Sequence, residues 1–321
     1  MIGLYKVLGV PFGFLLKLIY ETIGFGNFAV SIVLLTLIAR LILIPSSIQQ
    51  QKGMAKNQRM QSKIRKIQEK YAGDQRRIQE ETQALYQREG YNPMSAGCGA
   101  PMIIQFLILF GLIGAIYYPL SNFLRGIPSQ EITTLTSLIT SFKPANMAKS
   151  TIMDELLVVQ HIKEIAAKAL EKGVSQATID KIGAINFSFF GLFNLGDIPK
   201  NFKFPHIIWV IPVLSTISTL ASSLYSMIKQ KDQQQNAAAA KSMGCMTIGM
   251  AGLSLWFVVS YPAGIGIYWI ASGLFGFIQS VLIGHFYSPK KVLAKIMVEE
   301  TVQRRSKENN IKFAAKVNEE K

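Results

Sequence analysis

The chain has 321 residues, half of them hydrophobic and only 17% charged, and its formal net charge is +15. Because the apolar residues form long uncharged runs, this composition excludes an ordinary water-soluble domain and is typical of an integral membrane protein. The Lys and Arg residues lie between these runs, so the positive charge does not by itself indicate a nucleic-acid-binding protein. Cys98 and Cys245 lack the partner spacing of a metal or redox site, and we interpret them as packing residues.

Residues 1–26 are predicted to form an outer interfacial amphipathic segment, with no cleavage site of a signal peptide. Lys17 and Glu21 lie opposite an apolar stripe with helical spacing. The stripe consists of Phe12, Leu15, Leu16, Ile19 and Ile23. We expect this helix to lie in the outer membrane interface.

Five stretches are apolar and almost free of charge over about 20 residues, the length that crosses a bilayer, and the first of them carries one charge within it, Arg40. These predicted spans are residues 27–47, 97–123, 206–229, 244–260 and 262–284. The last two are separated by a short turn at Tyr261, Pro262, Ala263 and Gly264. The sequence therefore predicts an all-α integral membrane protein with five transmembrane helices.

The Lys and Arg residues of the connecting segments predict the orientation in the membrane. Segment 48–96 has ten of them, segment 285–321 has nine, and the short linker 230–243 is also basic. We expect these three segments in the cytoplasm, with the N-terminus outside and the C-terminus inside. Loop 124–205 has nine basic and seven acidic residues, and at about 80 residues it exceeds the length over which the charge rule operates.

The basic segment 48–96 is predicted to be a cytoplasmic helical hairpin with a break at residues 72–74. Its two apolar stripes consist of Met60, Ile64, Ile67 and Tyr71, and of Ile78, Thr82 and Leu85. The stripes can pair and leave a basic face free, although a solvated spacer has the same composition. Loop 124–205 is expected to contain an amphipathic helix, because apolar residues recur at helical spacing between Leu156 and Leu170.

Arg40 is a charged residue well inside a predicted span, where its burial costs about 2.5 to 3.5 kcal/mol on insertion-based scales. Its side chain can snorkel to the cytoplasmic interface. Polar residues that repeat at helical spacing favour instead a polar cavity within the bundle, although each stripe alone is also explained by close helix packing. Together with Arg40, the candidate cavity residues are Thr36, Gln105, Ser215, Thr219, Ser222, Tyr268, Ser272 and Gln279.

No catalytic site is predicted. The five spans contain no Asp or Glu, and His206 and His285 stand only at their ends, so intramembrane proteolysis lacks its acids, bases and metal ligands. The sequence has no Walker or GxGxxG loop, so we expect no nucleotide and no cofactor. The polar groups can bind and solvate a substrate, and we do not expect an enzyme.

Four segments resemble the YidC/Oxa/Alb family of membrane protein insertases. They are Leu37–Pro45, Asn92–Gln105, Phe190–Pro199 and Tyr261–Trp269, and they resemble in order the first core helix, the start of the second, the segment before the third and the turn into the fifth. The resemblance implies that Arg40 is the single basic residue of a hydrophilic groove open to the cytoplasm and to lipid. It also implies groove-lining roles for Gln105 and Trp256.

The chain departs from the family pattern at a few points. Gly273 stands where Asn is usual, and the outer loop 124–205 is longer than in most Gram-positive members. The large periplasmic domain of Gram-negative relatives and the lipoprotein Cys of many Gram-positive ones are absent from this sequence. The resemblance therefore implies a Gram-positive type in the cell membrane.

The expected function is that of a membrane protein insertase. A polar, often acidic, outer segment of a nascent protein enters the groove, where Arg40 and the hydroxyl groups replace its hydration. The apolar segment then leaves sideways into lipid, driven by about 25 cal/mol per Å² of buried apolar surface. The alternative is a small anion transporter or channel in which Arg40 selects the solute, although five unlike helices lack the paired repeats of transporters.

The expected partners are nascent membrane proteins and the lipid bilayer. The ribosome, contacted through the basic tail and the hairpin, and the Sec translocon are further candidates. The tail 285–321 can attract ribosomal RNA or acidic lipid equally well. We expect the protein to work as a monomer.

Overall fold

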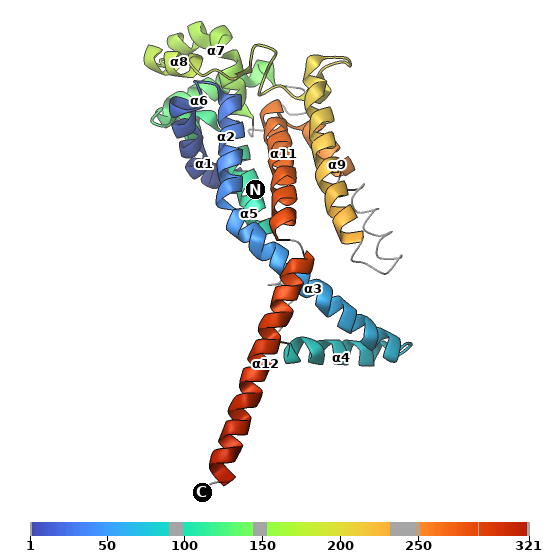
Figure 1. Cartoon of the computed structure of the whole chain (residues 1–321). Coiled ribbons are helices and arrows are strands. Elements are labelled where there is room, and N and C mark those ends of the chain that lie inside the picture. Colours follow the sequence, from blue (N-terminus) through green and yellow to red (C-terminus); the bar gives the residue numbers. More distant parts are fainter. Residues whose placement is uncertain are drawn as a thin grey trace. The chain divides into compact units, whose positions relative to one another are not determined.

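The computed structural model describes residues 2–89, 99–143, 153–231, 249, 251–287 and 289–319, and most of these residues are helical (Figure 1). The chain divides into two compact units, which are described separately. The first unit contains Met1–Ile42 and Ile103–Ile278, and the second contains Leu43–Met102 and Gln279–Lys321.

Two helical segments in the described part of the chain are long and apolar enough to cross a membrane, Ile207–Ile228 and Ala263–Phe286. A third crossing results if Phe28–Ile42 and Ile44–Gly53 form one interrupted span, and Ile103–Tyr117 and Ala251–Ser260 are shorter apolar helices. These helices agree with an all-α membrane protein. The number of five spans stays a prediction, because parts of the second and fourth spans lie outside the described residues.

The first predicted span is interrupted within its range. Helix α2 (Phe28–Ile42) ends before Leu43, and α3 (Ile44–Lys70) begins after it. Pro45 lies in the first turn of α3, where its missing N–H leaves no donor unsatisfied, whereas its ring cannot follow a continuous helix. The break therefore has a local cause in the sequence.

The first unit begins with α1 (Ile2–Thr22), which packs against α2 and against the π-helical turn η1 (Pro119–Leu124) at the end of α5 (Gly99–Tyr117). The contact is close because a Cβ atom at Gly114 would lie 2.0 Å from the Tyr5 carbonyl oxygen and 2.8 Å from the Gly9 Cα. Small residues allow such an approach of two helix backbones.

Helix α1 carries apolar residues both on the side that is buried in the core and on its exposed side. Leu16 and Ile19 from the predicted stripe are buried in the protein core, whereas Leu15 and Ile23 are exposed. Another apolar face is exposed as well, and it consists of Val7, Val10, Phe14 and Leu18. The helix therefore fits a position between the other helices and lipid, and its place in the membrane interface stays a prediction.

Residues 124–205 have more regular structure than the single amphipathic helix that the sequence predicts. Their elements are α6 (Ser129–Leu138), η2 (Ile139–Phe142), α7 (Asp154–Glu171), α8 (Gln176–Gly183), β1 (Ser188–Phe189), β2 (Phe193–Asn194), η4 (Pro199–Asn201) and, just beyond, η5 (Ile207–Trp209). The predicted helix lies in α7, where Leu156, Ile162 and Ile165 are buried and Leu170 is exposed. Figure 1 shows α6, α7 and α8 gathered at one end of this unit.

The two strands form an antiparallel hairpin, with Ser188 opposite Asn194. The chain after β2 supports the start of α11 (Ala263–Phe286): the Ala263 N–H donates to the Asp197 carbonyl at 2.8 Å, and the Gly264 N–H donates to the Leu195 carbonyl at 2.8 Å. The first N–H groups of a helix have no partner within it. Two of the segments that resemble the insertase family are therefore in contact. Backbone carbonyls of Phe190–Pro199 accept hydrogen bonds from the first N–H groups of the helix that begins within Tyr261–Trp269.

Glu155, at the start of α7, anchors this helix to η1. Its carboxylate accepts hydrogen bonds from the Ser121 backbone N–H at 2.8 Å and from the Ser121 hydroxyl at 2.6 Å, and the residue is buried. Burial raises the pKa of Glu155 above its ordinary value, although the bonds from Ser121 act in the opposite direction. The folded protein therefore favours the protonated carboxyl more than the unfolded chain does.

We expect replacement of this carboxyl with an amide to change the pH dependence of stability. Because the folded pKa is raised, the folded state binds the proton more tightly, and wild type loses this contribution as pH rises through the raised pKa. In Glu155→Gln the amide oxygen can accept from the backbone N–H and the amide nitrogen can donate to the hydroxyl. The melting temperature of Glu155→Gln in detergent, relative to wild type, should rise as the pH increases from the ordinary glutamate pKa of about 4.3 through the raised pKa of Glu155. Parallel curves over this range would contradict the assignment.

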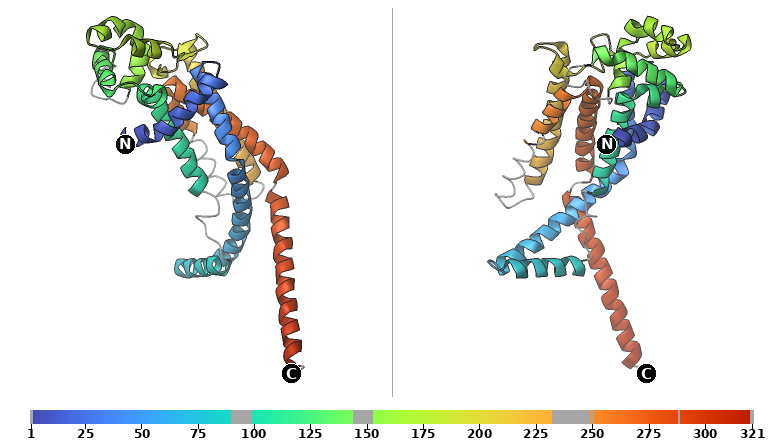
Figure 2. Two further views of the ribbon diagram at one scale, coloured as in Figure 1. Left: turned by 90° about the vertical axis from the view of Figure 1, so that its left-hand side faces the viewer. Right: turned by 180° about the vertical axis from the view of Figure 1, so that it is seen from behind.

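The second unit contains α3, α4 (Gln75–Arg88) and the C-terminal helix α12 (Pro289–Glu319). Residues 71–74 join α3 to α4, and the Asp74 carboxylate accepts from the Arg77 N–H at 3.1 Å as the N-cap of α4. Helix α12 packs against α3, and its C-terminal half extends beyond α3 and α4 (Figure 2).

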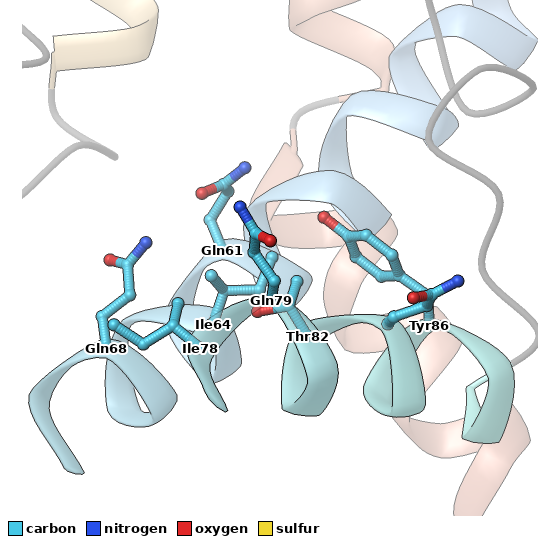
Figure 3. Close-up of a pocket in the computed structure, with 8 residues that line it drawn as sticks. Gln61, Ile64, Gln68, Ile78, Gln79, Thr82 and Tyr86 are labelled. Atoms are coloured by element: carbon cyan, nitrogen blue, oxygen red, sulfur yellow. The ribbon is translucent and has the colours of Figure 1, made fainter. Parts of the chain in front are cut away.

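A pocket of about 450 Å³ lies between α3 and α4 (Figure 3). Four glutamines line it together with Ile64, Ile78, Thr82 and Tyr86. The Lys63–Glu89 ion pair joins the two helices beyond the pocket. The facing residues of the hairpin are thus a mixture of apolar and amide side chains.

Candidate functional site

Arg40 is held against α11 inside the first unit. Its Nη2 donates to the Ser272 hydroxyl at 2.6 Å and to the Ser272 carbonyl at 3.1 Å. From α5, the Gln105 Nε2 donates to the Tyr268 hydroxyl at 2.7 Å and approaches the Ser272 hydroxyl at 3.4 Å. We call these four residues the Arg40 cluster, which joins α2, α5 and α11.

The charge of Arg40 is not neutralised by a neighbour in the described part of the chain. Within these residues its guanidinium forms no ion pair with Asp or Glu, and its hydrogen bonds all go from Nη2 to Ser272. Arg40 is only partly buried, and a guanidinium has five N–H donors. The remaining donors can therefore meet an acceptor that the protein itself does not supply.

Gly276 provides the space in which the guanidinium lies. A Cβ atom at this position would be 3.4 Å from the Arg40 Nη2 and 3.5 Å from its Cζ. Gly276 follows Ser272 by one helical turn, so both share the face of α11 that meets α2. In the sequence, Gly276 continues the polar repeat of Tyr268 and Ser272, although it is not one of the candidate cavity residues. The repeat of small residues every four positions after Tyr268 is the signal that points to it.

The hydroxyl groups of α9 (Val210–Lys231) make bonds that belong to helix packing. Ser215 donates to the Pro212 carbonyl, and Thr219 donates to the Ser215 carbonyl and lies 3.4 Å from the Ser254 hydroxyl. Ser222 donates to the Gly273 carbonyl of α11 at 3.0 Å. Ser222 thus joins α9 to α11, Thr219 joins it to the helix Ala251–Ser260, and Ser215 bonds within α9. None of the three makes a hydrogen bond to the Arg40 cluster within the described residues.

Within the described residues, the other candidate residues make no hydrogen bond to the Arg40 cluster. The Thr36 hydroxyl is buried and donates to the Ile32 carbonyl of its own helix at 2.7 Å. Trp256 has 61% of its surface exposed. Gln279 belongs to the second unit, where its Nε2 donates to the Ser47 hydroxyl at 3.0 Å.

The site can bind but offers little acid–base chemistry. The Arg40 cluster combines a cation, an amide and two hydroxyl groups, which donate and accept hydrogen bonds. Among the described residues, no group of three or more His, Cys, Asp or Glu side chains could hold a metal ion.

These features define an integral membrane protein with a polar cluster among its apolar helices. Residues 18–291 match the model of the 60Kd inner membrane protein family, and the chain belongs to this family, the YidC/Oxa family. It is 28% identical over 283 residues to the membrane protein insertase YidC of Clostridium perfringens, covering 88% of this chain and 89% of that protein.

Two further relatives extend the similarity. The membrane protein insertase YidC of Caldanaerobacter subterraneus is 26% identical over 270 residues, which cover 84% of this chain and 90% of that protein. The membrane protein insertase MisCA of Bacillus subtilis is 24% identical over 261 residues, which cover 80% of this chain and 70% of that protein.

Proposed function

We propose that this protein is a membrane protein insertase that receives polar segments of nascent membrane proteins at the Arg40 cluster. The observation that carries the proposal is a partly buried guanidinium that has no carboxylate partner among the described residues. A cation in an apolar bundle is costly and is usually kept for a function. The names of the relatives support the same activity.

In the proposed mechanism, a polar outer segment of the substrate exchanges water for the groups of the Arg40 cluster. The free N–H donors of Arg40 face acceptors on the substrate, and the bonds to Ser272 keep the guanidinium in place. The apolar segment of the substrate then moves sideways into lipid. Burial of its surface drives the step at about 25 cal/mol per Å², so no nucleotide is needed.

We place the protein in a bacterial cell membrane as a multi-pass protein with its N-terminus outside and its C-terminus in the cytoplasm. The basic segments of the second unit support this orientation. The hairpin of α3 and α4 would then face the cytoplasm, where its pocket can receive a polar substrate segment. Cooperation with the Sec translocon is compatible with a monomer that releases its substrate into lipid.

Reconstitution in liposomes tests the proposal. A single-span test protein synthesised outside the liposomes should acquire a protease-protected segment only when the insertase is present. An anion channel would instead release a trapped anion, such as iodide, without protecting the test protein. Anion release without insertion would replace our proposal with the transport alternative.

We expect α12 to contact the ribosome through its charge. Arg304, Arg305 and Lys307 are exposed on this helix, where Arg304 pairs with Glu308. Replacing all three with Gln should weaken ribosome binding and make it less sensitive to salt, because fewer counterions are released from RNA phosphates. Cosedimentation with ribosomes at several salt concentrations measures both effects. Unchanged binding would exclude the ribosome contact and leave acidic lipid as the partner of the tail.

A further inference from the structure

Two turns of the first unit hold a phenylalanine in left-handed backbone geometry. Phe25 has φ of 53° and Phe190 has φ of 49°, and each is followed by a glycine that is also left-handed, Gly26 and Gly191. Glycine adopts this geometry without steric cost, whereas a side chain with a Cβ atom does not. Phe25 stands just after α1, where helices commonly end in a left-handed glycine.

The two phenyl rings gain little from the protein around them. Phe25 is 90% exposed and Phe190 is 68% exposed, and the Phe190 ring meets the edge of the Phe189 ring at a centroid distance of 5.1 Å. Glycine at either position would relieve the backbone while losing little buried surface. Internal stability therefore does not account for phenylalanine here, and such strained residues point to an external function.

The two turns are joined in one patch. The Asn27 side chain donates to the Ser188 carbonyl at 3.4 Å, and the Phe28 N–H donates to the Asn186 carbonyl at 3.2 Å. The Asn186 N–H in turn donates to the Tyr20 hydroxyl at 3.0 Å. One backbone hydrogen bond and two side-chain hydrogen bonds therefore connect the turn after α1 and the end of this helix to residues 186–188, at the start of the β1–β2 hairpin.

Each phenylalanine has a further exposed apolar residue two positions away. Ile23 is 50% exposed and Leu192 is 55% exposed. Helix α1 also exposes Val7, Val10, Phe14 and Leu18, and the exposed Glu21 and Thr22 lie between this face and Phe25. An exposed apolar patch on a membrane protein marks an interaction surface. Phe, Trp and Leu are typical of surfaces that bury their apolar side at the headgroup boundary of a bilayer, and lipid accepts them without a shaped pocket.

We propose that the Phe25–Gly26 turn and the Phe190–Gly191 turn, which lies within residues 124–205, insert their rings into the bilayer interface. The patch then anchors this outer part of the chain on the lipid surface. The connection between the turns makes the two rings act together, so that α7 and the start of α11 keep a fixed depth relative to lipid. This anchoring does not depend on the insertase function.

Spin labelling tests the depth of both turns. Phe25→Cys and Phe190→Cys are prepared in a chain with Cys98→Ser and Cys245→Ser, labelled with a nitroxide and reconstituted in phosphatidylglycerol–phosphatidylethanolamine liposomes. Lys172→Cys, exposed in the turn after α7, is the matched aqueous control. We expect both phenylalanine positions to be severalfold less accessible to a water-soluble nickel chelate than Lys172→Cys, and more accessible to oxygen.

Two outcomes would overturn the proposal. Equal nickel accessibility at all three positions would place the turns in water, where a soluble partner could cover them. Spin–spin broadening that disappears on dilution with unlabelled protein would identify a second copy as the partner. A Phe25→Gly, Phe190→Gly double variant should melt in detergent at the same or a higher temperature, and a clear decrease would show that the rings serve internal packing.

Discussion

Insertion of substrates with acidic outer segments should fall at least about tenfold in Arg40→Ala, whereas neutral outer segments should insert nearly as in wild type. The guanidinium has no carboxylate partner among the described residues, so its attraction is available to the substrate. Arg40→Lys should retain much of the activity, because varied substrates need the positive charge more than a bidentate fork. Protease protection in liposomes measures insertion at matched protein levels.

Gly276 offers a matched pair of variants that keep Arg40 itself. Gly276→Ala places a Cβ atom in ordinary contact with the guanidinium and should behave as wild type. Gly276→Leu fills the space beside Ser272 and should reproduce the substrate selectivity of Arg40→Ala. Equal losses for acidic and neutral substrates would indicate a structural role of Arg40, and full activity of Arg40→Glu would show that its charge has no role.

Gly114→Leu should prevent folded protein from accumulating. A Cβ atom would lie 2.0 Å from the Tyr5 carbonyl oxygen, and backbone on both sides cannot give way as a flexible side chain can. Overpacking usually costs about 1 to 3 kcal/mol, and here we expect the upper end or more because α1 must separate from α5. Membrane accumulation and the melting temperature in detergent report the loss.

Gly252→Leu is the matched control for this prediction. Gly252 lies in the apolar helix Ala251–Ser260, and among the described residues no atom beyond its own stretch of helix lies within 4 Å of a Cβ built there. The same substitution should therefore leave the melting temperature close to wild type. Similar losses in both variants would mean that leucine disturbs insertion of the chain itself, and an unchanged Gly114→Leu would contradict the close contact of α1 with α5.

The sequence predicts elements that carry a local signal. Residues 72–74 contain the predicted Ala-Gly-Asp break, and α3 and α4 flank it. The predicted apolar stripe between Leu156 and Leu170 lies in α7. The hairpin of β1 and β2 has strands of two residues each, which are too short to show a period of two. Helix α8 has eight residues, and its few apolar positions give no distinct stripe.

The candidate site shows a different limit of sequence reasoning. Helical spacing places Tyr268, Ser272 and Gly276 on one face of α11, but the same spacing on α9 cannot tell a cavity lining from a helix contact. The bond from Ser222 to the Gly273 carbonyl depends on how α9 docks against α11. Which hydroxyl groups lie near Arg40 is therefore decided by tertiary packing.

The support of the α11 start by the Leu195 and Asp197 carbonyls has a consequence for how this protein can vary. Every amino acid carries a backbone carbonyl, so no single substitution at these two positions removes the acceptors. A change in chain length after β2 would shift them away from the Ala263 and Gly264 N–H groups. We therefore expect these two hydrogen bonds to survive side-chain replacement and to be lost on insertion or deletion, although replacing the fully buried Leu195 would still cost packing.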